Sequence, residues 1–231
     1  MEDKILKEYT LLYAEDDSQL RENYSYLFSK YFKKVYQAAD GLEALDLYNR
    51  HLPDILVSDI SMPNMDGLTL AKKIREHDSV MRIIILSAHG DQDKLLSAVK
   101  LQLVDYLLKP VKRSVLMETL ISAVQSYPSE LQQNRPTKLC EEYIWLPSSK
   151  ELLKDSQKVH LTKKEQVLLS LLFSNTDQYF SVDTIKDHFF TELDEAAISL
   201  ESLRSVIKRL KPKLPANCIQ NEFGVGYKIQ L

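Results

Sequence analysis

The sequence predicts a doubly wound α/β domain followed by a smaller α+β domain. Up to about residue 127, short apolar runs alternate with segments of helical period, which is the pattern of βα units around a parallel sheet. A polar stretch with two prolines then interrupts this rhythm. Beyond it, short strand-like segments, helical segments and a terminal hairpin follow one another. The 231 residues are enough for two domains that each bury a core.

The first domain, residues 1–126, contains five apolar runs that suit strands buried on both faces of a parallel sheet. These runs lie at residues 10–14, 35–38, 55–58, 83–86 and 106–108. Helices are expected from residue 18 and at residues 41–50, 68–76, 92–102 and 114–125. Ser18 is expected to cap the first helix, whose apolar face holds Leu20, Tyr24, Leu27, Phe28 and Tyr31. The order predicts a (βα)5 fold.

Residues 127–139 (YPSELQQNRPTKL) are predicted to form a linker, because they are polar and lack periodicity. The second domain, residues 140–231, opens with antiparallel strands expected at residues 143–146, 152–154 and 158–161. Helices are expected at residues 163–174, 182–190 and 198–210, and a hairpin pairs residues 218–220 with 227–230. Helices followed by a terminal hairpin indicate a winged helix-turn-helix.

Glycine is scarce, with 5 residues in 231. No G-x-G-x-x-G or G-x-x-x-x-G-K-[ST] motif occurs, so dinucleotide-binding and P-loop sites are excluded. The same scarcity excludes a collagen-like or glycine-rich low-complexity chain. The remaining composition, 44% hydrophobic and 27% charged, is that of a globular protein.

Nothing in the sequence predicts secretion or a membrane segment. The first ten residues, MEDKILKEYT, contain acids and no apolar run, unlike a signal peptide. No apolar run approaches the roughly 18 residues that cross a bilayer. Cys140 and Cys218 form no C-x-x-C pair, so neither a disulfide framework nor a zinc site is expected. We therefore expect a cytoplasmic protein with no membrane partner.

Polar or charged residues stand at the ends of four predicted strands. Glu15 and Asp16 follow the first strand, Asp59 ends the third, Ser87 ends the fourth and Lys109 ends the fifth. Because the carboxyl ends of parallel strands form the ligand-binding crevice of an open sheet, we expect these side chains to converge. Three neighbouring carboxylates repel one another, and Mg²⁺ would relieve that repulsion through its preference for oxygen ligands.

The same residues suit a phosphoryl transfer. Lys109 would add a positive charge that can pair with a phosphoryl oxygen. Asp59 can then act as a nucleophile and form an aspartyl-phosphate, a reaction that needs little beyond positioning and charge neutralisation. Each residue alone would be an ordinary loop or cap residue, and the prediction depends on the whole set.

The motifs Glu15-Asp16, residues 59–67 (DISMPNMDG), Ser87-Ala88 and Lys109-Pro110 resemble the receiver domain of two-component response regulators over residues 8–126. The resemblance implies that a sensor histidine kinase phosphorylates Asp59. It implies Mg²⁺ ligands at Glu15, Asp16, Asp59 and the main-chain carbonyl of Ser61, with Ser87 and Lys109 on the phosphoryl group. It implies no enzyme beyond the domain's own phosphoryl transfer and autodephosphorylation.

Two readings compete with parts of this resemblance. Tyr106 matches the family's aromatic switch position, although a half-buried strand aromatic would look the same in the sequence. Phosphatases of the haloacid dehalogenase type also form aspartyl-phosphates, but with a D-x-D-x-[TV] motif. Ile60 and Ser61 follow Asp59 here, so the second acid of that motif is missing.

The second domain is not basic as a whole, because residues 140–231 hold 12 Lys and Arg against 13 Asp and Glu. Residues 204–213 (RSVIKRLKPK), however, include five basic residues and no acid. On the predicted helix one face holds Leu200, Leu203, Ile207 and Leu210, and the opposite face holds Ser202, Ser205, Lys208 and Arg209. This division suits a helix in a DNA major groove, although a charged run can also be a solvated surface.

Residues 223–227 (FGVGY), Leu161-Thr162 and residues 207–211 (IKRLK) resemble the OmpR/PhoB class of response regulators over about residues 141–231. The resemblance implies that residues 198–210 form the recognition helix and that residues 224–227 form a wing on the DNA backbone or minor groove. Phosphate contacts to double-stranded DNA would come from Lys208, Arg209, Lys211 and Lys228, which would make binding steeply salt-dependent.

The resemblance also concerns protein partners. This class pairs charges across its fourth and fifth helices to form a homodimer on phosphorylation. Leu95, Val115 and Thr119 occupy several of those positions here, whereas Asp105 is kept, so we expect a more apolar interface or another geometry. Residues 189–197 (FFTELDEAA) match a loop that meets RNA polymerase, and core anchoring by Phe189 and Phe190 is the alternative.

The sequence therefore predicts a DNA-binding transcriptional regulator that phosphorylation of Asp59 activates. Phosphorylation would draw Ser87 and Tyr106 toward the phosphate and remodel the dimer face. A phospho-dependent protein-interaction module is the alternative, because the second domain is neutral and its wing has one cation, Lys228. A regulator independent of phosphorylation is a third reading, against which the complete pocket argues.

Overall fold

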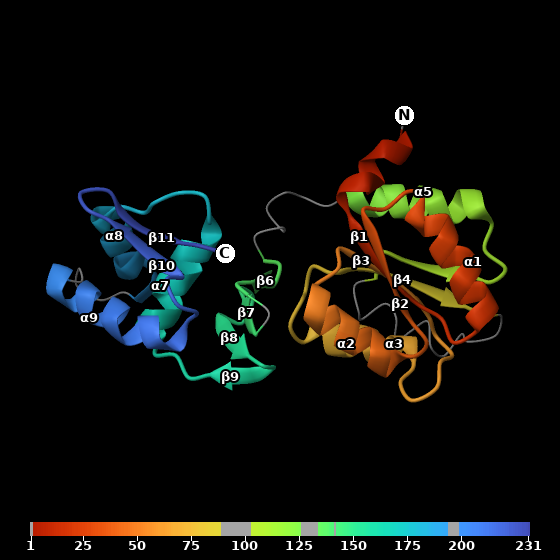
Figure 1. Ribbon diagram of the computed structural model, residues 1–231, viewed down its shortest axis with the longest axis horizontal. Coiled ribbons are helices and arrows are strands. Elements are labelled where there is room, and N and C mark those ends of the chain that lie inside the picture. The colour runs from red at the N-terminus through yellow and green to blue at the C-terminus, as the bar shows by residue number, and fades with distance from the viewer. Residues whose placement is uncertain (1, 89–102, 126–133, 141, 194–198) are drawn as a thin grey trace. The chain divides into compact units, whose positions relative to one another are not determined.

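The computed structural model describes residues 2–88, 103–125, 134–140, 142–193 and 199–231. The chain divides into two compact units, Met1–Gln132 and Gln133–Leu231. Figure 1 shows a layered α/β arrangement in the first unit and a smaller mixture of helices and short strands in the second. The helix expected at residues 92–102, together with Leu95, lies outside the described residues.

The first unit is built on five parallel strands in the order β2-β1-β3-β4-β5. The strands are β1 (Thr10–Ala14), β2 (Lys34–Ala38), β3 (Ile55–Asp59), β4 (Arg82–Ser87) and β5 (Asp105–Leu108). The described helices are α1 (Ser18–Ser29), α2 (Gly41–His51), α3 (Gly67–Arg75) and α5 (Arg113–Gln125). The doubly wound parallel sheet predicted from the sequence is confirmed. A 3-10 helix, η1 (Glu2–Glu8), precedes β1 and was not predicted.

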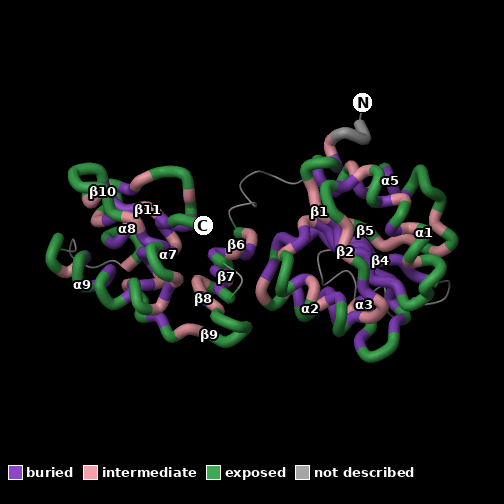
Figure 2. The backbone as a smooth tube through the Cα atoms, viewed as in Figure 1, coloured by how far each residue is buried: buried purple, intermediate pink, exposed green. Residues whose placement is uncertain are grey.

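Side chains alternate between the two faces of this sheet, and each face has its own core. On β1, Leu12 and Ala14 pack with residues of α2 and α3, and we call this group the α2–α3 core. Leu11 and Tyr13 pack with residues of α1 and α5 in a second group, the α1–α5 core. The central strands are buried throughout, as Figure 2 shows in purple. Burial on both faces explains why β3 and β4 read as continuous apolar runs.

Aspartates cap α1, α2 and α3 in the first unit. The predicted cap Ser18 is wrong, because the carboxylate of Asp17 accepts the hydrogen bond from the Leu20 N–H at 2.9 Å. Asp40 and Asp66 cap α2 and α3 in the same way. An aspartate both accepts from the first turn and interacts favourably with the positive end of the helix dipole, so it prevails over the neighbouring serine.

The second unit contains a four-stranded antiparallel sheet, three described helices and a C-terminal hairpin. Its sheet comprises β6 (Thr137–Lys138), β7 (Tyr143–Leu146), β8 (Glu151–Lys154) and β9 (Gln157–Val159). The helices are α7 (Lys163–Ser174), α8 (Val182–Leu193) and α9 (Leu200–Leu210), followed by the 3-10 turn η2 (Lys211–Lys213). The hairpin pairs β10 (Ile219–Glu222) with β11 (Gly226–Ile229). The predicted winged helix-turn-helix is confirmed.

The end of the predicted linker is part of the second unit. Thr137 and Lys138 pair with Trp145 and Ile144 of β7, and Leu139 is buried in the core. A strand of two residues is too short to show a period of two in the sequence, so it could not be predicted. Its pairing with β7 supplies hydrogen-bond partners for the backbone of this segment.

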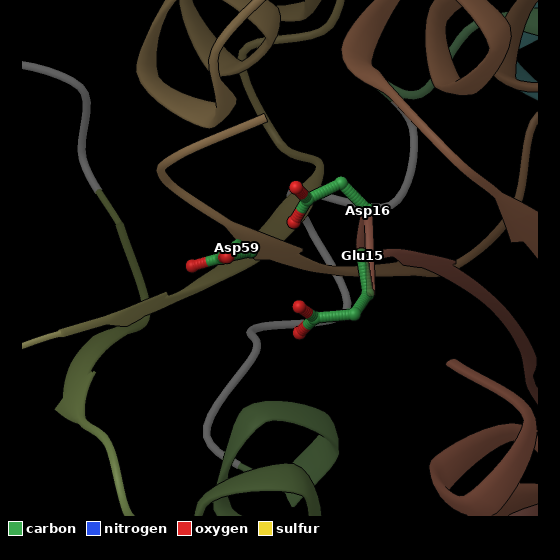
Figure 3. A group of neighbouring side chains, drawn as sticks. All are labelled: Glu15, Asp16 and Asp59. Atoms are coloured by element: carbon green, nitrogen blue, oxygen red, sulfur yellow. The ribbon is translucent and has the colours of Figure 1, made fainter. Parts of the chain in front are cut away.

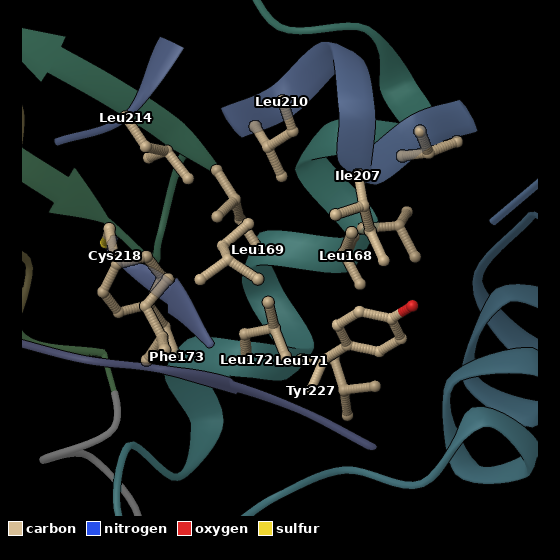
Figure 4. Packing of buried hydrophobic residues seen from close by; sticks show 14 of the residues in the cluster. Leu168, Leu169, Leu171, Leu172, Phe173, Ile207, Leu210, Leu214, Cys218 and Tyr227 are labelled. Carbon is tan, nitrogen blue, oxygen red and sulfur yellow. The ribbon is translucent and has the colours of Figure 1, made fainter. Parts of the chain in front are cut away.

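One core holds the second unit together. Leucines of α7 meet Ile207 and Leu210 of α9 and Tyr227 of β11, as Figure 4 shows. Trp145 is fully buried and stacks on Phe173, with ring centroids 5.3 Å apart and the planes 9° from parallel. This packing ties the sheet, the helices and the hairpin to a single unit. Among the residues that the structure describes, no helix has both the length and the apolar character that crossing a membrane requires.

An ion pair with a buried carboxylate joins the start of α7 to η2, the turn that follows α9. Glu165 is 1% exposed, and its Oε2 accepts from Lys213 Nζ at 2.7 Å and from the Thr162 N–H at 2.7 Å. Burial alone would raise the pKa of Glu165, but the hydrogen bonds from Lys213 and Thr162 outweigh burial and lower it. The lysine that the sequence places in a cationic run is thus committed to a structural contact.

Lys213→Met should lower the free energy of unfolding of the second unit by about 1–3 kcal/mol at neutral pH, since Glu165 keeps its buried charge but loses its partner. Because the folded pKa of Glu165 lies below the unfolded value of roughly 4.3, this stabilisation is present above that pH and is lost as pH falls through the folded pKa. Urea unfolding followed by circular dichroism should show the deficit shrinking in acid. Lys211 is an exposed neighbour, and Lys211→Met is the control. An equal loss of unfolding free energy in Lys211→Met would contradict a specific role for the ion pair between Lys213 and Glu165.

Candidate functional site

Three carboxylates meet at the carboxyl-terminal edge of the parallel sheet. Glu15 and Asp16 follow β1, and Asp59 is the last residue of β3. One ligand atom from each lies within 4.8 Å of the others, in the part of the chain that the structure describes (Figure 3). Glu15 and Asp59 are buried and Asp16 is exposed. The predicted convergence of these three residues is therefore what the structure shows.

The pairing of β1 with β3 produces this arrangement. Residues 11–14 of β1 lie beside residues 55–58 of β3 in parallel register, so both strands end at the same edge. Glu15 and Asp16 are consecutive, and their side chains leave β1 in opposite directions because of the pleat. Figure 3 shows their carboxylates pointing to different sides, with Asp59 on the neighbouring strand.

Lys109 supplies the opposite charge. It follows β5, and its Nζ lies 2.7 Å from Glu15 Oε2 and 3.1 Å from Asp59 Oδ2. Burial alone would lower the pKa of Lys109, but the hydrogen bond that it donates to Glu15 and the charge of Asp59 raise it overall. Burial raises the pKa of Glu15, an effect that Lys109 opposes. Lysine thus neutralises part of a charge that the three carboxylates would otherwise share.

Ser87, Tyr106 and Ser61, the other residues expected at this site, lie in different environments. Ser87 is buried at the end of β4, and its hydroxyl donates to the Ala88 carbonyl at 2.9 Å. Tyr106 is half-buried in β5 and packs against the α2–α3 core. Ser61 is exposed in the turn directly after Asp59 and Ile60. The roles expected of these three residues stay predictions.

The turn after Asp59 packs tightly against its own strand. The Gly67 N–H donates to the Ile60 carbonyl at 3.0 Å, and the Gly41 N–H donates to the Met65 carbonyl at 3.1 Å. A Cβ on Gly67 would clash with the carbonyl oxygen of Asp59. The sequence indicates a turn at Gly67, and the structure adds the reason that glycine is required: the backbone approaches Asp59 too closely for a side chain.

Two residues that the sequence analysis missed hold Glu15. The Tyr13 hydroxyl donates to Glu15 Oε2 at 3.1 Å. Arg21 Nη1 donates to the Glu15 carbonyl at 2.6 Å and to the Asp16 carbonyl at 3.2 Å. Tyr13 could have been found from the two-residue period of β1, which places it on the same face as Glu15. No comparable sequence signal marks Arg21, whose contacts depend on the angle at which α1 leaves β1.

The helix expected to enter DNA has a different apolar face from the one predicted. Leu203, Val206, Ile207 and Leu210 are buried, whereas Leu200 is 38% exposed. Ser199 caps α9 by accepting from the Ser202 N–H at 3.1 Å, so Leu200 is the first helical residue and projects beyond the core. Leu203, Val206, Ile207 and Leu210 stand at positions i, i+3, i+4 and i+7 and form one apolar stripe along the helix. Leu200 is not part of this stripe, and Val206 is.

The expected DNA-contacting side chains remain on the surface. Ser205, Lys208, Arg209 and Lys211 are exposed, and Ser202 and Lys228 are half-buried. Lys228 Nζ lies 5.8 Å from the centre of the Tyr179 ring. An exposed cationic face on a helix whose other face is buried is the arrangement that a groove-binding helix needs. The contacts themselves are not tested by the structure.

The wing is the β10–β11 hairpin. Gly224 and Gly226 have φ values of +79° and +144°, a region that favours glycine. Gly226 also lies against the Phe180 backbone, with which Tyr227 forms an antiparallel bridge. At the tip, the side chain of Phe223 is fully exposed. The wing is thus anchored at its base and apolar at its tip.

Two surfaces expected to meet proteins are partly described. Val115 is 40% exposed on α5, and Thr119 Oγ1 donates to Asp105 Oδ2 at 3.4 Å. The predicted helix end at residue 190 is wrong, because α8 continues to Leu193, so residues 189–193 of the segment are helical. Phe189 is buried and Phe190 is exposed, so only the first of the two phenylalanines anchors the core. Residues 194–198 lie outside the described residues.

Two families of known proteins match this chain, one in each unit. Residues 11–121 match the family described as response regulator receiver domain. Residues 156–229 match the family described as transcriptional regulatory protein, C terminal.

Individual relatives match either most of the chain or its first part. The chain is 30% identical over 230 residues to a probable transcriptional regulator ycf27 of Guillardia theta, covering 95% of this chain and 90% of that one. It is 25% identical over 231 residues to the transcriptional regulatory protein SrrA of Staphylococcus aureus, covering 96% and 95%. Among solved structures, the receiver domain of the response regulator AraT from Geobacillus stearothermophilus is 35% identical, covers 54% of this chain and 96% of that one, and has a TM-score of 0.46.

Gly67→Ala should destabilise the first unit by about 1–3 kcal/mol, because the added methyl group forces the turn away from the Asp59 backbone. Thermal unfolding measures this loss. Gly224→Ala is the matched control: it has open space for the methyl group and strain only in φ, so it should cost about 1 kcal/mol in the second unit. A first unit unchanged by Gly67→Ala would show that the close approach does not constrain the turn.

Proposed function

We propose how phosphate controls this chain, which belongs to the OmpR/PhoB class of two-component response regulators. The two matched families make it a phosphorylation-dependent, DNA-binding transcriptional regulator and not a conventional enzyme. A histidine kinase and DNA are its partners in general terms. The observation that carries the detailed proposal is the cluster of three carboxylates with one lysine at the edge of the sheet.

The residues of the cluster fit a divalent cation. Three oxygen ligand groups stand within 4.8 Å of one another, and at least one of them, Asp16, is open to solvent. Mg²⁺ prefers such ligands and retains water on its open side. Glu15, Asp16, Asp59 and the Ser61 carbonyl would hold it, and the ion would supply positive charge to the oxygens of the transferred group. This donor set contains no nitrogen or sulfur that would favour zinc.

In the proposed reaction Asp59 is the phosphoacceptor. One carboxylate oxygen attacks phosphorus, and the bond between phosphorus and the histidine nitrogen of the kinase breaks, so that the electron pair leaves with the imidazole. The Ile60 N–H donates to Asp59 Oδ1 at 2.8 Å and holds the carboxylate in position. Lys109 Nζ already contacts Asp59 Oδ2, and it can turn from there to a phosphoryl oxygen. Attack of water on the same phosphorus would break its bond to the Asp59 oxygen, release inorganic phosphate and restore the carboxylate, which is autodephosphorylation.

The signal would leave the site through Ser87 and Tyr106. Ser87 would turn its hydroxyl from the Ala88 carbonyl to the phosphoryl group, and the half-buried Tyr106 would move inward with it. The surface that includes Val115, Thr119 and Asp105 would then form the homodimer. Exposed Phe190 and the residues after it would meet RNA polymerase. A regulator of this kind acts on DNA, which fits the cytoplasmic location expected from the sequence.

For DNA, we propose that α9 enters the major groove. Its exposed Ser205, Lys208 and Arg209 would face the duplex, and Lys211 and Lys228 would contact phosphates. The half-buried Ser202 lies on the first turn of the same helix. Two protomers would place two such helices on a repeated or palindromic site.

One observation favours a second candidate function. The wing tip presents Phe223, fully exposed, and the hairpin strands bring one cation, Lys228, which lies against Tyr179. Such a tip suits a protein surface as well as DNA, and it favours a phospho-dependent protein-interaction module with weak DNA binding. Salt dependence separates the candidates, because counterion release accompanies phosphate contacts only.

Asp59→Asn should abolish covalent labelling of the chain by acetyl phosphate in Mg²⁺, because an amide oxygen does not act as the nucleophile. Electrophoresis that resolves phosphoprotein measures the label. Asp46→Asn, which alters an exposed carboxylate paired with Arg50 on α2, should be labelled as wild type is. Labelling of Asp59→Asn at the wild-type level would place the phosphate elsewhere.

Lys208→Ala and Arg209→Ala should each weaken binding to double-stranded DNA and reduce the slope of log affinity against log salt by about 1. Fluorescence anisotropy over a salt series gives both quantities. Lys33→Ala, an exposed charge in the first unit, is the control and should leave both unchanged. If the two α9 variants keep the wild-type slope, the assignment of α9 to DNA is wrong. That result would favour the protein-interaction module.

A further inference from the structure

The side chain of Glu15 is held at one of its two oxygens. Lys109 Nζ donates to Oε2 at 2.7 Å, and the Tyr13 hydroxyl donates to the same atom at 3.1 Å. Among the residues that the structure describes, no contact of comparable kind falls on Oε1. The two donors therefore fix the carboxylate from one side and leave its second oxygen available to a cation.

The two donors differ in freedom. Lys109 is a flexible side chain, 24% exposed, and it also lies 3.1 Å from Asp59 Oδ2. Tyr13 is fully buried, and its ring packs edge-on against Phe28 with centroids 5.4 Å apart, and against Tyr24 at 5.8 Å. A phenol held in this way keeps its hydroxyl in one place whatever occupies the site.

The pleat of β1 explains how a core residue reaches the site. Tyr13 and Glu15 are two residues apart, so both face the α1–α5 core side of the sheet. The ring fills that core, and its hydroxyl needs a partner because buried polar groups are hydrogen-bonded. Glu15 is the partner, so the packing of α1 determines where the acidic side chain points.

A fixed donor matters most when Lys109 turns away. Glutamate has one more rotatable bond than aspartate, and the repulsion from Asp16 and Asp59 favours rotation of Glu15 away from them. In the resting arrangement Lys109 opposes that rotation. Once Lys109 pairs with a phosphoryl oxygen, Tyr13 is the side-chain donor that remains on Glu15.

We propose that Tyr13 is a positioning residue, which holds the Glu15 carboxylate in the orientation that binds the divalent cation and keeps it there when Lys109 moves to the phosphoryl group. This inference rests on the proposed function of the acidic cluster. Tyr13 contacts neither the cation nor the phosphoryl group, and it acts through Glu15 alone.

Tyr13→Phe keeps the ring and removes only the hydroxyl. In the full chain, calorimetric titration with MgCl2 should show a dissociation constant raised roughly threefold to tenfold. The MgCl2 concentration for half-maximal labelling by acetyl phosphate should rise by the same factor, while the rate at saturating MgCl2 stays near wild type. Tyr24→Phe removes a hydroxyl from the neighbouring ring, and it should leave both constants unchanged.

A second background separates positioning from general weakening of the fold. In Lys109→Met, Tyr13 is the remaining side-chain donor to Glu15, so adding Tyr13→Phe should raise the Mg²⁺ dissociation constant by a larger factor than it does in wild type. Equal factors in the two backgrounds, or a wild-type constant for Tyr13→Phe, would overturn the proposal while the proposed function stands. A wild-type chain that binds no Mg²⁺ and takes no label would overturn both.

Discussion

Electrostatic repulsion among Glu15, Asp16 and Asp59 is the constraint on which the first unit depends. Folding brings three acidic side chains to one edge of a sheet, and two of them are buried. Lys109 offsets part of that cost by contacting both buried carboxylates. The edge of the sheet is therefore held by the ion pairs that Lys109 forms with these two carboxylates.

The strands connect this edge to the two cores. Alternate residues of β1 belong to opposite faces, and the hydroxyl of Tyr13, a residue of the α1–α5 core, donates to Glu15. Gly67 brings the turn after β3 against the backbone of Asp59. Packed interiors shift between discrete arrangements and do not deform smoothly. A small displacement at the site is thus suited to produce a defined change at the surface of the domain.

The parts of the molecule that the sequence predicts are those with a strong local signal. Buried parallel strands appear as apolar runs, and the strand ends locate Glu15, Asp59 and Lys109. The choice among candidate residues within one element was harder to predict. Asp17 caps α1 where Ser18 was expected, and Val206 of α9 is buried where Leu200 was expected. Hydrophobic periodicity carries no information on contacts between separate segments. Two such contacts were therefore not predicted: that of Lys213 with Glu165, and that of Arg21 with the Glu15 carbonyl.

The stacked Trp145 has a spectroscopic consequence. It is the one tryptophan in the chain, and it lies fully buried against Phe173 in the core of the second unit. Its emission therefore comes from the DNA-binding half, whereas the first unit contributes tyrosines. Fluorescence excited selectively at the indole therefore reports on the second unit alone. A change of this emission on phosphorylation of the first unit would be a direct optical signal that the two units are coupled.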